Sequence, residues 1–257
     1  EAVTPAGTGY LGGLNFGGVN YKSWGFMTII SWPIGGVLAA SVAWLIGKTA
    51  LGLRSDYLAI ATLGISEIII AVMKNEDWLA RGVKNVSGLP RPVPYEIDLQ
   101  ENVSFLEWVS SFGGDPVTTS SIIVKLGYGG LFTLVLVIIL TLAQLALASP
   151  WGRMMRAIRD NEYAAGAMGK NIKARHLQVF IIGSAICGVA GAMMTTLDSQ
   201  LTPTAYQPLR FTFLIWVMVI VGGSGNNFGS VLGGFLIFFL WVQVEPIGTM
   251  LMQGITA

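Results

Sequence analysis

The stretch SPWGRMMRAIRDNEYAAGAMGKNIKARH, residues 149–176, separates two long apolar runs and decides how the chain is laid out. Residues 126–148 before it and 177–197 after it carry no charged side chain. Because about 20 apolar residues in a helix cross the hydrocarbon core of a bilayer, each run predicts a spanning helix. Against two acidic residues, the stretch holds six basic ones: Arg153, Arg156, Arg159, Lys170, Lys173 and Arg175. Short loops rich in Lys and Arg stay in the cytoplasm, so we expect 149–176 to be a cytoplasmic loop.

The middle of this loop predicts a short surface helix. Pro150 and Gly169 bracket it, and Arg156 with Asp160 and Arg159 with Glu162 stand at helical pairing distance. Its far end is made of residues with little side-chain bulk: Ala164, Ala165, Gly166, Ala167 and Gly169. Another protein could therefore approach the backbone closely, although an ordinary basic connector explains the composition equally well.

The pattern of Glu162, Ala164, Ala165 and Gly169 resembles the cytoplasmic EAA-type motif of ABC importer permeases, except that Tyr163 separates the Glu from the Ala pair. Four stretches, in order, are similar to the permease subunit of branched-chain amino-acid ABC transporters. They are YLAIATLGISEII (57–69), GVKNVSGLPRP (82–92), GRMMRAIRDNEYAAGAMGKN (152–171) and VIVGGSGNNFGSVLGG (219–234). Together they cover most of the chain.

This resemblance implies one transmembrane permease domain over 1–257, forming half of a heterodimeric pore in a bacterial inner membrane. It implies a second homologous permease, two cytoplasmic ATP-binding subunits and a periplasmic solute-binding protein as partners, with branched-chain amino acids as substrates. ATP hydrolysis would occur in the partners. The residues that would couple to the ATPases are Arg156, Arg159, Glu162, Ala164, Ala165 and Gly169.

Composition indicates an all-α polytopic membrane protein. Of 257 residues, 53% are hydrophobic and 11% charged, against the roughly 25% charged residues of a soluble domain. Membrane lipid must therefore surround it. The formal net charge of +1, with its basic residues beside apolar runs, gives no sign of a nucleic-acid partner.

The other apolar runs bring the expected total to about six spanning or partly spanning helices. Residues 24–47 are uncharged and predict the first, after an irregular Gly-rich segment over 1–23. Residues 57–73 predict a short one with Glu67 inside it, where a charged carboxylate is costly and usually faces protein or water. Thr62, Ser66 and Glu67 are thus candidates for the translocation pathway. The alternative places Glu67 at the interface or against a neighbouring helix.

Residues 211–244 form a charge-free run that would be about 50 Å long as one helix, too long for one span and too short for two. We expect it to break within 222–229, leaving a short helix and a longer one. Gly222, Gly223 and Gly225 either border the transport path at a break within the membrane or form a plain cytoplasmic turn. In the span over 177–197, Gly183, Gly188 and Gly191 are spaced to let a neighbouring helix come close.

Residues 74–121 are the sizeable polar region and predict an extracytoplasmic loop. Pro90, Pro92 and Pro94 exclude helix from its middle. Residues 102–112 read as a short amphipathic helix, and a landing surface for a binding protein is plausible there.

Catalytic and metal sites are not indicated. Cys187 and His176 are the single residues of their types, so thiol or His-pair metal sites are excluded, and we expect neither metal nor cofactor. No nucleotide-binding, hydrolase or metalloprotease motif is present. A urea or other amino-acid ABC permease remains the alternative within the class, and a proton-coupled secondary transporter using Glu67 the alternative outside it. Because the chain starts at Glu1, we expect it to be a fragment of a longer subunit.

Overall fold

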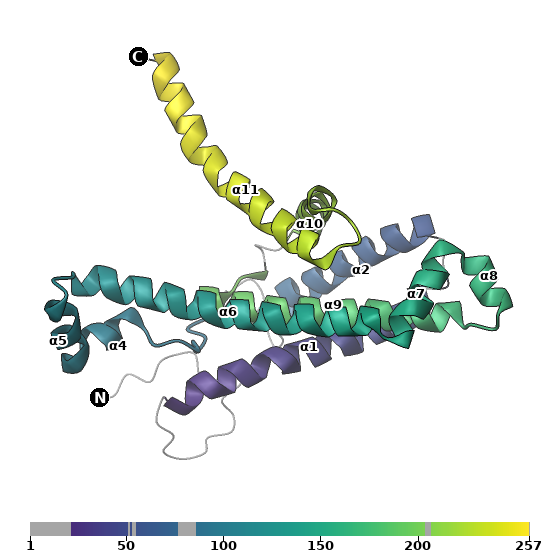
Figure 1. The fold of residues 1–257 in the computed structure, drawn as a ribbon, viewed down its shortest axis with the longest axis horizontal. Helices are drawn as coiled ribbons and strands as arrows, with labels where there is room; N and C mark the ends of the chain where they lie inside the picture. Colours follow the sequence, from purple (N-terminus) through teal and green to yellow (C-terminus); the bar gives the residue numbers. More distant parts are fainter. Residues whose placement is uncertain (1–21, 51, 53–54, 77–85, 204–206, 257) are drawn as a thin grey trace.

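The structure is a computed structural model that describes residues 22–50, 52, 55–76, 86–203 and 207–256. Residues 1–21 of the predicted irregular segment lie outside the described residues, while its last two, Lys22 and Ser23, already belong to the first helix. The fold is helical (Figure 1). The helices are α1 (Lys22–Ala50), α2 (Ser55–Asn75), α4 (Glu96–Gln100), α5 (Val103–Ser111), α6 (Pro116–Ala148), α7 (Pro150–Asp160), α8 (Glu162–Ala167), α9 (Ile172–Asp198), α10 (Pro208–Gly222) and α11 (Asn227–Thr256).

Among the residues that the structure describes, four helices are long and apolar enough to cross a membrane. They are Thr28–Ala50, Pro116–Ala148, Ile172–Asp198 and Asn227–Val244. The apolar α10 is 15 residues long, and α2 is 21 residues long with Glu67 inside it. The four candidate spans and the shorter apolar α10 confirm the predicted all-α polytopic fold; α2 stays a predicted partial span.

Local sequence explains where the helices begin. Six start next to a residue whose side-chain oxygen accepts a hydrogen bond from a backbone N–H of the first turn: Asn102, Asp115, Ser149, Asn161, Asn171 and Asn226. Such caps satisfy donors that have no partner inside the helix. Proline occupies the first turn of α6, α7 and α10, where its missing N–H costs nothing.

The closest pairing of long helices joins α1 and α9. Trp32 Nε1 donates to Thr196 Oγ1 at 3.3 Å, which pairs the first half of α1 with the end of α9, so the two helices run antiparallel. At Gly188 the backbones touch, because an added Cβ would lie 2.5 Å from Ala39 Cβ and 2.8 Å from Gly35 O. Small residues allow this approach, as is common between membrane helices.

The prediction of a close neighbour is correct for Gly188 and wrong for Gly183 and Gly191. Within the part of the chain that the structure describes, a Cβ at either of those positions would meet nothing within 4 Å. Spacing in sequence could not separate the three, because which face of α9 meets α1 depends on the tertiary arrangement.

The predicted loops lie at opposite ends of the molecule. Figure 1 shows α4 and α5 at one end of the long axis and α7 and α8 at the other. Because α1 is antiparallel to α9, Lys48 at the end of α1 lies at the α7 end. A two-residue antiparallel pairing of β1 (Val86–Ser87) with β2 (Gln200–Leu201) ties the polar region to the end of α9. Sidedness itself stays a prediction from charge.

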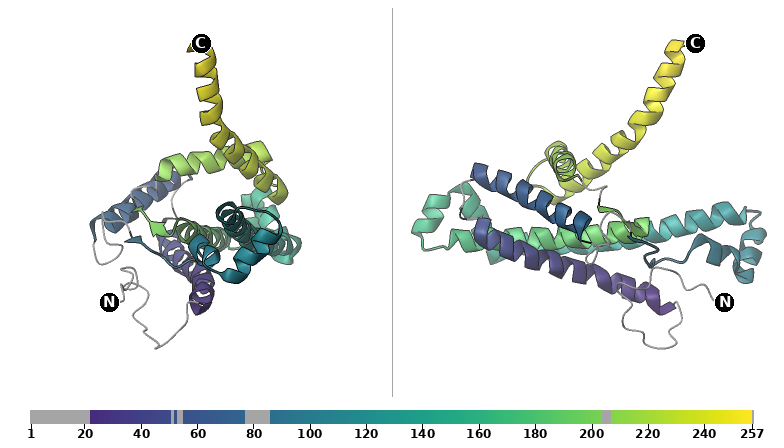
Figure 2. Two further views of the ribbon diagram at one scale, coloured as in Figure 1. Left: turned by 90° about the vertical axis from the view of Figure 1, so that its left-hand side faces the viewer. Right: turned by 180° about the vertical axis from the view of Figure 1, so that it is seen from behind.

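The last two helices cross each other, and α11 projects from the rest of the molecule (Figure 2). The chain breaks between α10 and α11, where Gly223 and Gly225 have φ of +93° and +96°. This confirms the predicted break, with a helix of 15 residues before it and one of 30 after it. The helices cross with the backbones of Gly222, Gly229 and Gly233 in direct contact, since a Cβ on any of them would overlap a backbone carbonyl.

Candidate functional site

The basic loop begins with a sharp turn from α6 into α7. Ser149 ends α6 and starts α7, and its Oγ accepts from the N–H of Gly152 at 3.4 Å. Gly152 is buried, and a Cβ there would lie 2.6 Å from the Ala146 carbonyl oxygen. The turn therefore requires glycine at 152, and the direction of α7 is set by its junction with α6.

Two arginines fasten α7 to the end of α6. Arg156 Nη2 donates to Leu147 O at 3.1 Å and Arg153 Nη1 to Ala148 O at 3.4 Å. The last carbonyls of a helix carry partial negative charge and have no partner inside the helix, so a guanidinium there is favourable. On the opposite side of α7, Ile158 is 3% exposed and anchors the helix by packing.

Both ion pairs predicted for this loop are wrong. Within its described residues, the ion pair is Arg159 with Asp160, at 3.0 Å. Arg156 turns back to α6 instead of reaching Asp160. Glu162 belongs to the next helix, so it does not lie one helical turn from Arg159 as the predicted ion pair required.

The single helix expected between Pro150 and Gly169 is divided in two at Asn161. This residue has extended backbone angles, φ −153° and ψ 101°, and its side-chain oxygen accepts from Ala164 N at 2.9 Å. Asn competes well for cap positions, so it ends α7 and starts α8. α8 ends at Ala167; just beyond it, Gly169 has a φ of +77° that suits glycine, and Lys170 N donates to Ala165 O at 3.2 Å.

The structure brings the predicted coupling residues together on α7 and α8, but not all on one face. Arg159, Glu162, Ala164 and Gly169 are exposed, while Ala165 is half-buried. Gly166 turns toward α9, where a Cβ would lie 3.2 Å from Ile172 Cδ1.

Two exposed side chains of this end of the molecule are absent from the predicted set. Tyr163 is 94% and Met168 81% exposed, and they flank α8. Large apolar side chains so exposed are typical of contact surfaces. In the sequence, the position of Tyr163 inside the EAA-type pattern could have indicated its exposure. No feature of the sequence indicated the exposure of Met168.

The pathway candidates lie on two helices that touch. Thr62, Ser66 and Glu67 are on α2, and α10 contacts both α2 and α11. Thr62 Oγ1 donates to Leu58 O at 3.0 Å and Ser66 Oγ to Leu63 O at 2.7 Å, so both hydroxyls are bonded within their own helix. Glu67 is exposed.

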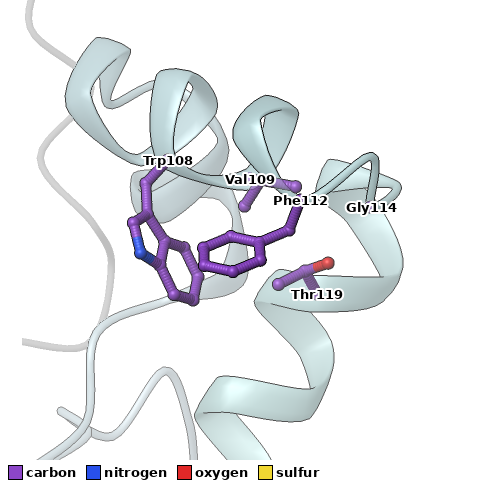
Figure 3. Close-up of a pocket in the computed structure, with 5 residues that line it drawn as sticks. All are labelled: Trp108, Val109, Phe112, Gly114 and Thr119. Atoms are coloured by element: carbon purple, nitrogen blue, oxygen red, sulfur yellow. The ribbon is translucent and has the colours of Figure 1, made fainter.

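The opposite end carries an aromatic groove. Trp108, Val109 and Phe112 of α5 meet Gly114 and Thr119 around a groove of about 250 Å³. Figure 3 shows the two rings side by side at its mouth. Trp108 and Phe112 are 52% and 77% exposed and stack edge to face with centroids 5.5 Å apart. The helix predicted over 102–112 is confirmed over Val103–Ser111, but only part of its apolar side is packed: Val109 is buried, whereas Trp108 and Phe112 are exposed.

The Pro-rich segment before α4 is held by Arg91. Arg91 Nε donates to Ser199 Oγ, Arg91 Nη1 lies 3.5 Å from Glu96 Oε2, and the guanidinium sits over the Tyr95 ring at 5.1 Å. The Ser199 carbonyl also accepts from Gly88 N and Leu89 N, both at 3.1 Å. Arg91 therefore joins the polar region to the end of α9.

Comparison with known proteins identifies the family. The helices describe a polytopic membrane protein, and residues 6–250 match the family described as "Branched-chain amino acid transport system / permease component". The chain belongs to this family, whose members are transport permeases and not enzymes. No solved structure matches the chain.

Curated relatives include branched-chain amino-acid permeases. The chain is 29% identical over 220 residues to the high-affinity branched-chain amino acid transport system permease protein LivM of Escherichia coli, which covers 85% of this chain and 51% of the relative. It is 26% identical over 203 residues to the probable LivM of Methanocaldococcus jannaschii, covering 77% and 51%. A segment is 29% identical over 96 residues to the ribose import permease protein RbsC of Haemophilus influenzae, covering 36% and 30%. The chain spans about half the length of the LivM relatives.

Proposed function

We propose that this chain is the membrane-spanning part of an ABC importer permease that moves branched-chain amino acids into the cytoplasm. Its partners are a second homologous permease, two cytoplasmic ATP-binding subunits and a periplasmic solute-binding protein, in a bacterial inner membrane. The match to the permease family over residues 6–250 carries this proposal. The projecting α7–α8 loop supports it, because a transporter powered by separate ATPases needs a surface on which they act.

The coupling surface consists of α7 and α8. α8 extends beyond the spans and offers an exposed backbone near Ala164 and Gly169, flanked by Tyr163 and Met168. α7 is fastened to α6 by Arg153, Arg156 and the turn at Gly152. A displacement of α8 by a closing ATPase pair would therefore move α6 and, through Gly166 and Ile172, α9.

The translocation pathway runs along α2 and the crossed helices α10 and α11. Thr62, Ser66 and Glu67 come from the first element, and Gly222, Gly223 and Gly225 from the second. The contact of α10 with both α2 and α11 supports this assignment. Helices interrupted by glycine often border transport paths, because two segments can move separately there.

The α5 groove is the docking site for the solute-binding protein. α5 lies at the end of the molecule opposite α7 and α8 (Figure 1), and its groove exposes Trp108 and Phe112. Exposed aromatic side chains around a groove are typical of docking surfaces.

Purification of the full-length subunit from its own membrane, followed by identification of the proteins that accompany it, tests the proposal. We expect two ATP-binding subunits and a second permease. Recovery of the subunit alone, from a membrane in which it transports substrate, would contradict the proposal and favour an autonomous transporter.

A further inference from the structure

A second groove is lined by residues of α6, α7 and α9. These helices meet at the basic end of the molecule (Figure 1). The groove has a volume of about 460 Å³. Its lining residues are Ala146 of α6, Ser149 between α6 and α7, Trp151 of α7, and Arg175, Gln178, Ile181 and Ile182 of α9. None of them belongs to the coupling or pathway candidates.

The lining is layered along α9. Arg175, Gln178 and Ile182 are spaced by three and four residues, so they lie above one another on one helix face. The cation is at the start of the helix and the isoleucines are one to two turns further in. Ala146 continues the apolar layer across from α9. The groove therefore has a polar mouth and an apolar floor.

The polar mouth is organised around one amide. Trp151 Nε1 and Arg175 Nη1 both donate to Gln178 Oε1, at 3.2 and 2.8 Å. The Arg175 bond uses one of the five N–H donors of the guanidinium, and its side chain is half-buried. The amide thus holds the guanidinium at the mouth with donors left for a ligand.

The depth of the groove matches the membrane boundary. The uncharged run of α6 ends at Ala148, and the uncharged run of α9 begins at Leu177. The mouth is therefore at the level of the lipid headgroups, while Ile181, Ile182 and Ala146 face hydrocarbon. Tryptophan and arginine are typical of this boundary.

The charge at the mouth favours an anion. No carboxylate lines the groove, and the loop carries six basic against two acidic residues, one of which is paired with Arg159. Basic pockets between membrane helices on the cytoplasmic side suit anionic lipid headgroups.

We propose that this groove binds an anionic phospholipid, with its phosphate at Arg175 and an acyl chain along Ile181 and Ile182. A lipid seated there bridges α9 and the α6–α7 turn, and so braces the base of the coupling surface. Free phosphate could contact the cation but has no apolar part to bury against the isoleucines. The apolar floor therefore adds binding free energy for a phospholipid only.

The test is lipid retention by the purified full-length subunit and by its assembled complex, measured by native mass spectrometry with phosphatidylglycerol and phosphatidylcholine as probes. We expect preferential retention of phosphatidylglycerol. Arg175→Gln should weaken it about tenfold or more, because a charge-assisted bond is lost. Lys170→Gln removes the same charge outside the groove and should change retention less than about twofold.

A second variant tests the floor without changing charge. Ile182→Trp fills the groove, and we expect loss of phosphatidylglycerol while Arg175 stays in place. Each alternative gives a distinct result. Equal retention of phosphatidylcholine, equal losses in Arg175→Gln and Lys170→Gln, displacement of the lipid by inorganic phosphate, or retention lost on assembly because a partner covers the groove would each overturn the proposal.

Discussion

Charge reversal at Arg156 tests whether α7 transmits movement through its attachment to α6. Arg156 Nη2 lies 3.1 Å from Leu147 O, at the negative end of the α6 dipole. For an exposed side chain such an interaction is worth about 1 kcal/mol, and Arg156→Glu replaces it with a repulsion of similar size. The swing of about 2 kcal/mol shifts the population of attached α7 by about thirtyfold. We therefore expect severe loss of binding-protein-stimulated ATP hydrolysis in the reconstituted complex, with the subunit still inserted.

The matched control is Lys170→Glu, which makes the same change of charge on an exposed side chain of the same loop. It should retain most of the stimulation, because the structure gives the Lys170 side chain no bond to α6. Arg156→Lys should lie between the two, since an ammonium can still reach the carbonyl. Stimulation that persists in Arg156→Glu, or that falls equally in Lys170→Glu, would refute the reasoning.

Gly188→Leu should lower the thermal midpoint of the purified subunit, because the larger side chain forces α1 and α9 apart and destabilises the fold by about 1–3 kcal/mol. Gly191→Leu, whose side chain meets open space, should leave the midpoint unchanged. Equal midpoints for the two variants would contradict the close packing of α1 against α9 at Gly188. Cysteine at Asn102 should react with an impermeant thiol reagent added from the periplasm and cysteine at Lys173 should not; the reverse pattern would overturn the orientation. Hydrogen bonds from Thr118 lower the pKa of Asp115 from its usual 3.8, so its capping stabilises the protein above that pH and is lost as pH falls through the lowered pKa. The midpoint difference between wild type and Asp115→Ala should therefore be present at neutral pH and vanish in acid, and a difference independent of pH would rule out the ionised cap.

The spans and the α10–α11 break could be predicted because they rest on local properties of the chain. Charge-free length sets the spans, and the run over 211–244 is too long for one helix, so the Gly-rich stretch inside it had to open. The caps at Asn102, Asp115 and Ser149 follow the same local rules.

The hydrogen bonds and helix ends of the candidate site could not be predicted, because several partners compete for the same residues and the spacing of residues in the sequence does not show which partner is chosen. Asn161 could continue the helix or cap the next one, and the cap prevailed. Arg156 had Asp160 within helical reach, yet the open carbonyls of α6 lie nearby only after the chain has turned at Gly152. Gly188 differs from Gly183 and Gly191 through the position of α1, which is a tertiary fact.

Glu67 offers the sharpest contrast between ATP-driven import and proton coupling, because it is a carboxylate within the α2 helix. The decisive measurement is leucine uptake into proteoliposomes containing the full complex, with wild type and Glu67→Gln compared. Gln keeps the shape and much of the hydrogen bonding of Glu but cannot release a proton. We expect accumulation to require ATP on the side of the ATP-binding subunits, to resist an uncoupler, and to survive Glu67→Gln with at most an altered rate. Accumulation that continues without ATP and collapses with the proton gradient, or with Glu67→Gln, would contradict the assignment as an ABC importer permease.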